Sequence, residues 1–97
     1  MIRVRLLREA AEELEAIAQY YDAERAGLGR AFIAEVRRAR QRVQEHPLAS
    51  AVERSEVRSR AVARFPYRIY YRVRENELLI IAIAHRRRQP GYWQARI

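Results

Sequence analysis

Hydrophobic residues recur every three or four positions in the first half of the chain, which is the period of an amphipathic helix. In the first such stretch, residues 8–21, the apolar stripe consists of Ala10, Leu14, Ile17 and Tyr21. In the second, residues 28–45, it consists of Leu28, Phe32, Val36, Ala39 and Val43. Gly27 and Gly29 interrupt the pattern between the two stretches, and Pro47 follows the second. Because the break is short, the two helices are predicted to form an antiparallel hairpin.

The other segments alternate apolar and polar residues with a period of two, which is typical of strands. We expect strands at residues 2–7, 57–64, 67–74 and 78–85, and a surface loop at 48–56. The last strand is apolar on both faces, which predicts a central place in the sheet. The pattern therefore predicts an α+β fold of β-α-α-β-β-β order in a single domain of residues 1–97. The helical hairpin would pack on one face of a curved antiparallel sheet.

Composition and the lengths of the apolar runs exclude several classes of protein. The sequence of 97 residues has no cysteine, so it forms no disulfide and no thiolate metal site. Its longest apolar run, 78–84, is far shorter than the roughly 20 residues of a membrane-spanning helix. The N-terminus lacks the continuous apolar stretch of an export signal. We therefore expect a cytoplasmic protein that binds no metal and no cofactor.

Positive charge is concentrated in the second half of the chain. All 20 basic residues are arginine, and the formal net charge is +8. Residues 1–51 hold nine arginines and eight acids, a net charge of +1, whereas residues 52–97 hold eleven arginines and four acids, a net charge of +7. Genomic base composition explains the absence of lysine, but it does not explain this asymmetry. The asymmetry indicates a negatively charged partner for the second half.

Side chains alternate between the two faces of a strand, so the pattern predicts where these arginines point. We expect the apolar positions of 57–64 and 67–74 to lie under the helices and the basic positions to share the opposite face. That face would carry Arg58, Arg60, Arg64, Arg68, Arg72 and Arg74. A solvated sheet face explains such a pattern on one strand. Like charges on two neighbouring strands favour a counter-ion, an acidic partner or nearby carboxylates.

A basic and aromatic tail follows the last predicted strand. It contains Arg86, Arg87, Arg88, Tyr92 and Trp93. Guanidinium groups form bidentate contacts with phosphate or carboxylate, and aromatic rings stack on nucleic-acid bases. The two aromatic residues are equally suited to anchoring the tail on the core. The sequence leaves both roles open.

Two blocks of the second half carry a family resemblance. The first is residues 64–73 (RFPYRIYYRV), and the second is residues 81–93 (IAIAHRRRQPGYW). Together with the apolar stripe of the first helix and the pair Tyr20 and Tyr21, they resemble the RelE/ParE superfamily of toxins from bacterial type II toxin-antitoxin systems. The resemblance covers nearly the whole chain.

The resemblance implies a toxin that a cognate antitoxin neutralises, and it leaves two mechanisms open. ParE-like members block DNA gyrase by binding, whereas RelE-like members cleave mRNA on the ribosome without a metal. In a RelE-like enzyme, the catalytic positions would be His85, Arg68 and Tyr92. The residues expected to bind the target or the antitoxin are Arg58, Arg60, Arg64, Arg68, Arg72, Arg87, Arg88 and Trp93.

We favour the gyrase mechanism over the ribonuclease mechanism. The natural base for RNA cleavage is a histidine or a carboxylate, and no carboxylate lies among the candidate residues. The acids of the second half are predicted in the loop or the turn, and they are Glu53, Glu56, Glu75 and Glu77. His85 closes a buried strand, where a structural role is more common. A plain nucleic-acid-binding module, with an affinity that falls as salt rises, is the third hypothesis.

Overall fold

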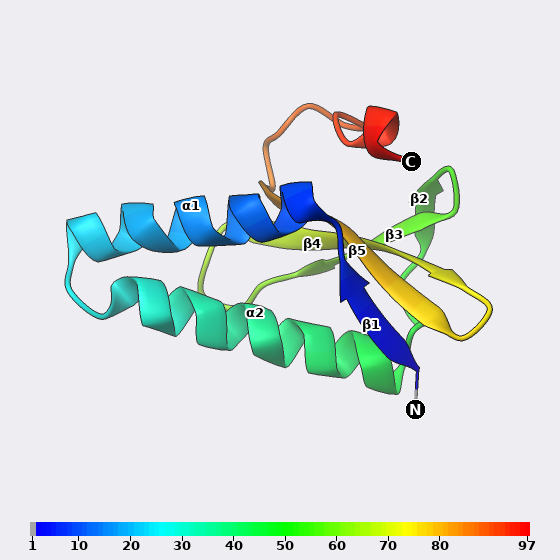
Figure 1. Cartoon of the computed structure of the whole chain (residues 1–97), viewed down its shortest axis with the longest axis horizontal. Coiled ribbons are helices and arrows are strands. Elements are labelled where there is room, and N and C mark those ends of the chain that lie inside the picture. Colours follow the sequence, from blue (N-terminus) through cyan, green and yellow to red (C-terminus); the bar gives the residue numbers. More distant parts are fainter. Residues whose placement is uncertain (1) are drawn as a thin grey trace.

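Two long helices and five strands make up the described part of the chain, residues 2–97 of a computed structural model (Figure 1). The elements are β1 (Arg3–Leu6), α1 (Arg8–Glu24), α2 (Leu28–Glu45), β2 (Val52–Arg54), β3 (Val57–Ala61), β4 (Tyr67–Arg74), β5 (Glu77–His85) and a 3-10 turn (Gln94–Arg96). Both predicted helices and all four predicted strands are present. Within residues 2–97, neither helix is long and apolar enough to cross a membrane.

One strand was not predicted. β2 lies inside the segment expected to be a loop, pairs with β3 and forms an edge of the sheet. Its three residues are all exposed, so the strand buries no side chain and shows no alternation that a sequence pattern can reveal. β3 in turn ends at Ala61, three residues before the predicted end.

The strands form one sheet in the order β1-β5-β4-β3-β2. β5 lies between β1 and β4, and seven of its nine residues are buried, as its apolar sequence predicts. The prediction of a wholly antiparallel sheet was wrong, because β1 pairs with β5 in the parallel direction. A tight hairpin forces two strands to be antiparallel, but β1 and β5 are joined through all the intervening elements, which set no such constraint.

The two helices pack closely because of Gly29. A Cβ atom at this position would lie well inside contact distance of the Ala18 carbonyl oxygen on α1. The Gly29 amide also donates a hydrogen bond of 2.7 Å to the Asp22 carboxylate at the end of α1. Any residue with a side chain at position 29 would therefore push the helices apart.

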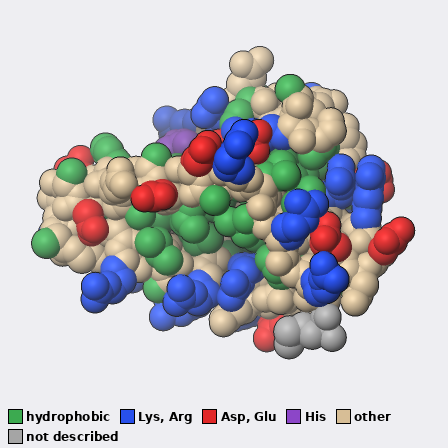
Figure 2. All heavy atoms as spheres, in the orientation of Figure 1, with side chains coloured by type: hydrophobic (Ala, Val, Ile, Leu, Met, Phe, Trp, Pro, Cys, Tyr) green, Lys and Arg blue, Asp and Glu red, His purple; other side chains and the backbone are tan. Residues whose placement is uncertain are grey.

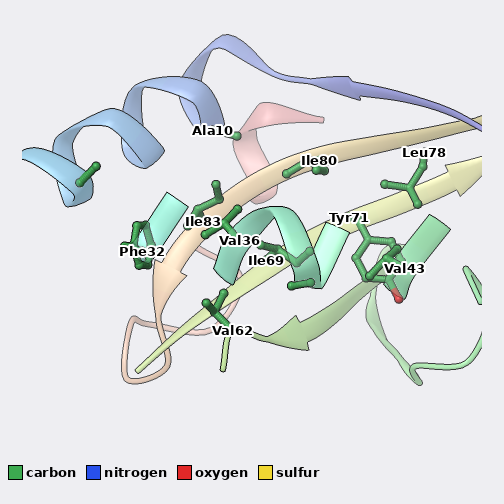
Figure 3. Packing of buried hydrophobic residues seen from close by; sticks show 12 residues of the cluster. Ala10, Phe32, Val36, Val43, Val62, Ile69, Tyr71, Leu78, Ile80 and Ile83 are labelled. Carbon is green, nitrogen blue, oxygen red and sulfur yellow. The ribbon is translucent and has the colours of Figure 1, made fainter. Parts of the chain in front are cut away.

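A first core fills the space between the helices and the sheet (Figure 3). Its buried residues are Ala10, Ala18, Phe32, Val36, Ala39, Val43, Val62, Ile69, Tyr71, Leu78, Ile80 and Ile83. At one end of this core, the ring of Phe65 packs edge-on against Phe32 and Tyr21. The ring of Tyr67 packs edge-on against Phe32. The predicted apolar stripes of both helices and of β4 thus meet here.

A second core lies on the other side of the sheet, beneath the C-terminal segment. Its buried residues are Val57, Leu79, Ile81, Ala82 and Trp93. A register shift in the β4–β5 pairing leaves Ile81 without an opposite residue, because Tyr70 pairs with Ala82 and Tyr71 with Ile80. Such a bulge turns two consecutive side chains to one face. Both sides of the sheet are therefore buried, one by the helices (the helix side) and one by the tail (the tail side).

The predicted single arginine face does not exist. Arg58 lies opposite Tyr71 and Arg60 opposite Ile69, and directly opposed residues of an antiparallel pair share a face. Arg58 and Arg60 are thus on the helix side, whereas Arg68, with Arg72 and Arg74, is on the tail side. The prediction took Val57 as a mark of the helix side, but Val57 belongs to the second core.

Candidate functional site

An apolar groove runs along the outer surface between α1 and α2. It has a volume of about 560 Å³ and is continuous, through Leu14 and Ile33, with a smaller hollow of about 140 Å³ beside β1 and β5. Its apolar lining consists of Leu6, Ala11, Leu14, Ala18, Ile33, Val36, Ile80 and Ile83. Figure 2 shows hydrophobic side chains gathered between the two helices. This surface is large enough for side chains of a partner.

The two walls of the groove carry opposite charges. α1 contributes Glu15 and Asp22, whereas α2 contributes Arg30, Arg37 and Arg40. The Nε atom of Arg40 is buried and has no hydrogen-bond partner within residues 2–97, although buried polar groups are nearly always paired. An apolar floor with charged walls is typical of a site that binds an amphipathic segment.

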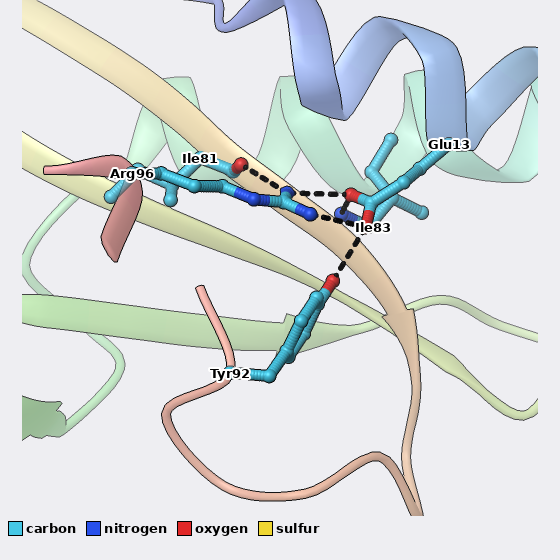
Figure 4. Close-up of polar contacts among 5 residues, drawn as sticks. All are labelled: Glu13, Ile81, Ile83, Tyr92 and Arg96. Atoms are coloured by element: carbon cyan, nitrogen blue, oxygen red, sulfur yellow. Dashed lines mark hydrogen bonds and ion pairs between the residues drawn. The ribbon is translucent and has the colours of Figure 1, made fainter. Parts of the chain in front are cut away.

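The tail is fastened to α1 and β5 through one carboxylate, that of Glu13 on α1 (Figure 4). Tyr92 donates its hydroxyl proton to this carboxylate at 2.8 Å, and Arg96 donates from two nitrogens at 2.8 and 2.9 Å. Glu13 also accepts the backbone N–H of Ile83, and Arg96 donates to the carbonyl oxygen of Ile81, each at 3.0 Å. β1 ends opposite Ile80, so the backbone groups of Ile81 and Ile83 at this edge of β5 have no neighbouring strand to pair with. The side chains of Arg96 and Glu13 bind these groups instead.

The same contacts shift the protonation of their members. Burial alone would raise the pKa of the Glu13 carboxyl, but hydrogen bonds from Arg96, Ile83 and Tyr92 outweigh it and lower that pKa. Burial, and then the hydrogen bond to Glu13, raise the pKa of the Tyr92 hydroxyl far above its ordinary value. Tyr92 is therefore a neutral donor at every physiological pH, and Glu13 is an anion.

The three residues proposed for RNA cleavage do not converge. The His85 ring packs edge-on against Tyr67 on the helix side, and its Nδ1 accepts the backbone N–H of Arg87 at 3.0 Å. Arg68 lies on the tail side and donates to the Ser59 hydroxyl at 2.9 Å. The Tyr92 hydroxyl is bound to Glu13 at the edge of β5.

The arginines predicted to bind a partner are also distributed. Arg58 donates to the carbonyl oxygens of Leu48 and Ser50, and so holds the loop before β2. Arg60 and Arg64 lie beside α2. Arg72 lines a hollow of about 470 Å³ on the tail side, with Arg3 and Arg74.

Within the tail, Arg87 is exposed, and the Arg88 guanidinium lies 4.0 Å from the centre of the Tyr92 ring. Trp93 is only 1% exposed. Of its two predicted roles, the side chain fulfils that of an anchor.

Carboxylates compensate three arginines of the tail side, one of the alternatives that the sequence left open. Arg74 pairs with Glu56 at 2.8 Å, and Arg5 on β1 pairs with Glu77 at 3.4 Å. Arg68 reaches Glu53 through the Ser59 hydroxyl, which donates to that carboxylate. Glu53 belongs to β2, the strand that was not predicted, so its proximity to Arg68 was not foreseen either.

The sequence nevertheless contains a signal for the two most buried carboxylates. Glu13 falls between Ala10 and Leu14 in the apolar stripe of α1, and Glu35 falls between Phe32 and Val36 in that of α2. A charged residue on an apolar stripe requires a partner, because a buried lone charge is costly. Glu13 finds Arg96 and Tyr92, whereas Glu35, 8% exposed, pairs with Arg38 and Arg64.

Comparison with known proteins gives a consistent result. The family described as "ParE toxin of type II toxin-antitoxin system, parDE" matches residues 4–90. Among solved structures, a chain of the "Chromosomal ParDE TA system from P. aeruginosa" superposes with a TM-score of 0.77 at 22% identity, over 88% of this chain and 96% of that one. At that identity, the superposition establishes a shared fold. None of the curated proteins matches this chain.

Proposed function

Because this chain belongs to the ParE toxin family of type II toxin-antitoxin systems, we propose that it inhibits bacterial growth in the cytoplasm by binding DNA gyrase. We further propose that a cognate antitoxin neutralises it by occupying the groove between α1 and α2. The first proposal concerns the target of the toxin, and the second concerns its partner at rest.

The separation of His85, Arg68 and Tyr92 is the observation that carries the choice of gyrase over mRNA. Metal-free RNA cleavage needs a base, a group that stabilises charge and an acid around one phosphate. Here the Arg68 side chain and the His85 ring lie on opposite sides of the sheet, and Tyr92 is held by an anion that keeps its proton in place. Inhibition by binding requires no such convergence, so this arrangement supports the ParE-like mechanism.

A supercoiling assay with the purified toxin tests the first proposal. We expect the protein to inhibit DNA gyrase and to leave ribosome-bound mRNA intact, and we expect the inhibition to persist in His85→Ala. Codon-positioned mRNA cuts that disappear in both His85→Ala and Arg68→Ala, with gyrase unaffected, would establish the RelE-like mechanism instead. Addition of the protein encoded by the adjacent gene should restore supercoiling.

The groove supports the second proposal through its shape and charge. An amphipathic helix would place apolar side chains on Leu14 and Ile33 and carboxylates against Arg37 and Arg40. Burial of such anchors accounts for most of the affinity of helix-in-groove complexes.

Charge introduced into the groove tests this occupant. We expect Ile33→Glu to weaken antitoxin binding by roughly 100-fold or more, because a carboxylate would be buried against the partner's apolar side chains. Leu48→Glu, at an exposed position outside the groove, is the matched control and should bind normally. Isothermal titration calorimetry measures both, and circular dichroism checks that each variant is folded. Equal binding by the two variants would place the antitoxin elsewhere.

A further inference from the structure

Three arginines line a small groove between α2 and β3, on the flank of α2 away from the apolar groove, and a fourth reaches the carboxylate in it. Arg38, Arg42 and Arg60 line it together with Glu35 and three alanines, in a volume of about 180 Å³. Arg64, which follows β3, reaches the same carboxylate. We call Arg38, Arg42, Arg60 and Arg64 the α2–β3 cluster.

Negative charge is scarce at this cluster. Glu35 accepts a hydrogen bond of 2.9 Å from Arg38 and lies 3.7 Å from Arg64, so a single carboxylate serves two guanidinium groups. Across residues 2–97, neither Arg42 nor Arg60 is paired with an acid. The tail side differs, because Arg5 and Arg74 each have a carboxylate of their own, and Glu75 and Glu77 line the hollow that holds Arg3 and Arg72. At the α2–β3 cluster, four arginines share one carboxylate, so most of the positive charge there is uncompensated.

The chemistry of the lining identifies the kind of anion. Apart from charged groups, the groove offers Ala39, Ala61 and Ala63, with no aromatic or large apolar side chain. A peptide partner draws most of its affinity from such anchors, and single-stranded nucleic acid needs rings on which bases stack. Contact with the phosphates of a duplex requires neither, because guanidinium groups alone bind them. Arg38 and Arg42, one helical turn apart, present two such groups side by side.

We propose that the α2–β3 cluster is a binding site for the phosphate backbone of duplex nucleic acid, independent of base sequence. The site lies apart from the apolar groove, so it remains accessible when that groove is filled. This inference does not depend on the proposed gyrase target, and either can fail without the other.

Two double variants of the full-length chain test the proposal with equal changes of charge. Arg42→Ala/Arg60→Ala removes two arginines of the cluster, and Arg30→Ala/Arg37→Ala removes two from the other flank of α2. The probe is a fluorescent DNA duplex of about 20 base pairs, and anisotropy is measured as a function of NaCl concentration. For the cluster variant, we expect affinity to fall roughly tenfold or more and the slope of log K against log salt to shrink by nearly 2, since each lost phosphate contact removes about 0.9. The control should lose less than about threefold.

Three results would overturn the proposal. The first is an equal loss in both variants, which would indicate a general effect of net charge. The second is a preference for single-stranded RNA of the same length over the duplex. The third is tighter binding of a labelled polyglutamate peptide than of the duplex, lost in the cluster variant, which would assign the cluster to an acidic protein. Antitoxin titration and gyrase inhibition, run on the same variants, report on the proposed function separately.

Discussion

The two sides of the sheet are both buried, but by different means. On the helix side, side chains such as Phe32, Val36 and Ile80 pack in a core made almost wholly of apolar groups. On the tail side, the burial centres on one indole, that of Trp93, at the end of the chain. Polar contacts from Tyr92 and Arg96 to the Glu13 carboxylate hold this segment in place.

The two sides of the sheet are therefore stabilised by different interactions. Apolar burial contributes in proportion to the area removed from water and depends little on pH. The tail is held by the Trp93 indole and by a hydrogen bond from Gln94 to Ser55, but its strongest polar attachment is to the Glu13 carboxylate and depends on the protonation of that group. The helix side should therefore persist under conditions that release the tail, and the single tryptophan makes tail release visible by fluorescence.

Removal of a large aromatic side chain from each core should give the largest effects. We expect both Trp93→Ala and Phe32→Ala to lower the free energy of unfolding by about 3–5 kcal/mol, the usual cost of deleting a buried aromatic ring. The two variants should differ in the region of the protein that is destabilised. Hydrogen exchange should accelerate mainly in residues 86–97 for Trp93→Ala, and throughout the helices for Phe32→Ala. Equal loss of protection in the helices of both variants would mean that the two cores unfold as one unit.

Loss of the Glu13 carboxylate should have an intermediate effect. Glu13→Ala leaves Arg96 without its ion pair and the Ile83 amide without its acceptor, and we expect a loss of roughly 2–3 kcal/mol, since hydrogen bonds to charged groups are the stronger ones. The Trp93 emission should shift to longer wavelength as the indole becomes hydrated. Glu12→Ala, at the exposed neighbouring position, is the control. An unshifted emission in Glu13→Ala would show that the indole holds the tail unaided.

The smallest effect is a dependence on pH. The pKa of Glu13 is lower in the folded protein than its ordinary value of 4.5, so the folded state favours the anion. The stability that it contributes is present above that ordinary value and is lost as pH falls through the lowered one. The difference in free energy of unfolding between the wild type and Glu13→Gln should therefore shrink between pH 7 and pH 3, as measured by urea denaturation. A constant difference would contradict this assignment.

Local patterns were sufficient to predict most of the fold. The helical stripes gave the bounds of α2 to the residue, and the unbroken apolar run of β5 gave its central place. The faces of β3 were not predictable in this way. Both sides of the sheet are buried, so an apolar residue such as Val57 does not identify the helix side. The bulge at Ile81 and the parallel pairing of β1 depend on partners that are distant in sequence.

The functional residues were predicted less well, for a related physical reason. Strand alternation correctly placed Arg68 and Arg72 on one face. It placed Arg60 on that same face, which was wrong, because the two faces of β3 had been assigned the wrong way round. The role of Glu13 depends on Arg96, 83 positions later in the chain. A stripe reveals that a carboxylate is buried, but it does not reveal the partner that binds it.

Gly29 fixes a dimension of the groove between α1 and α2. The helices meet there backbone to backbone, because the absent Cβ lets the Ala18 carbonyl approach. The spacing of the helix axes near this end is thus determined by main-chain atoms, which cannot adopt other rotamers. A ligand that binds this groove must match a fixed width near Gly29. The groove can change its shape only toward Leu14 and Ile33, where side chains form the floor.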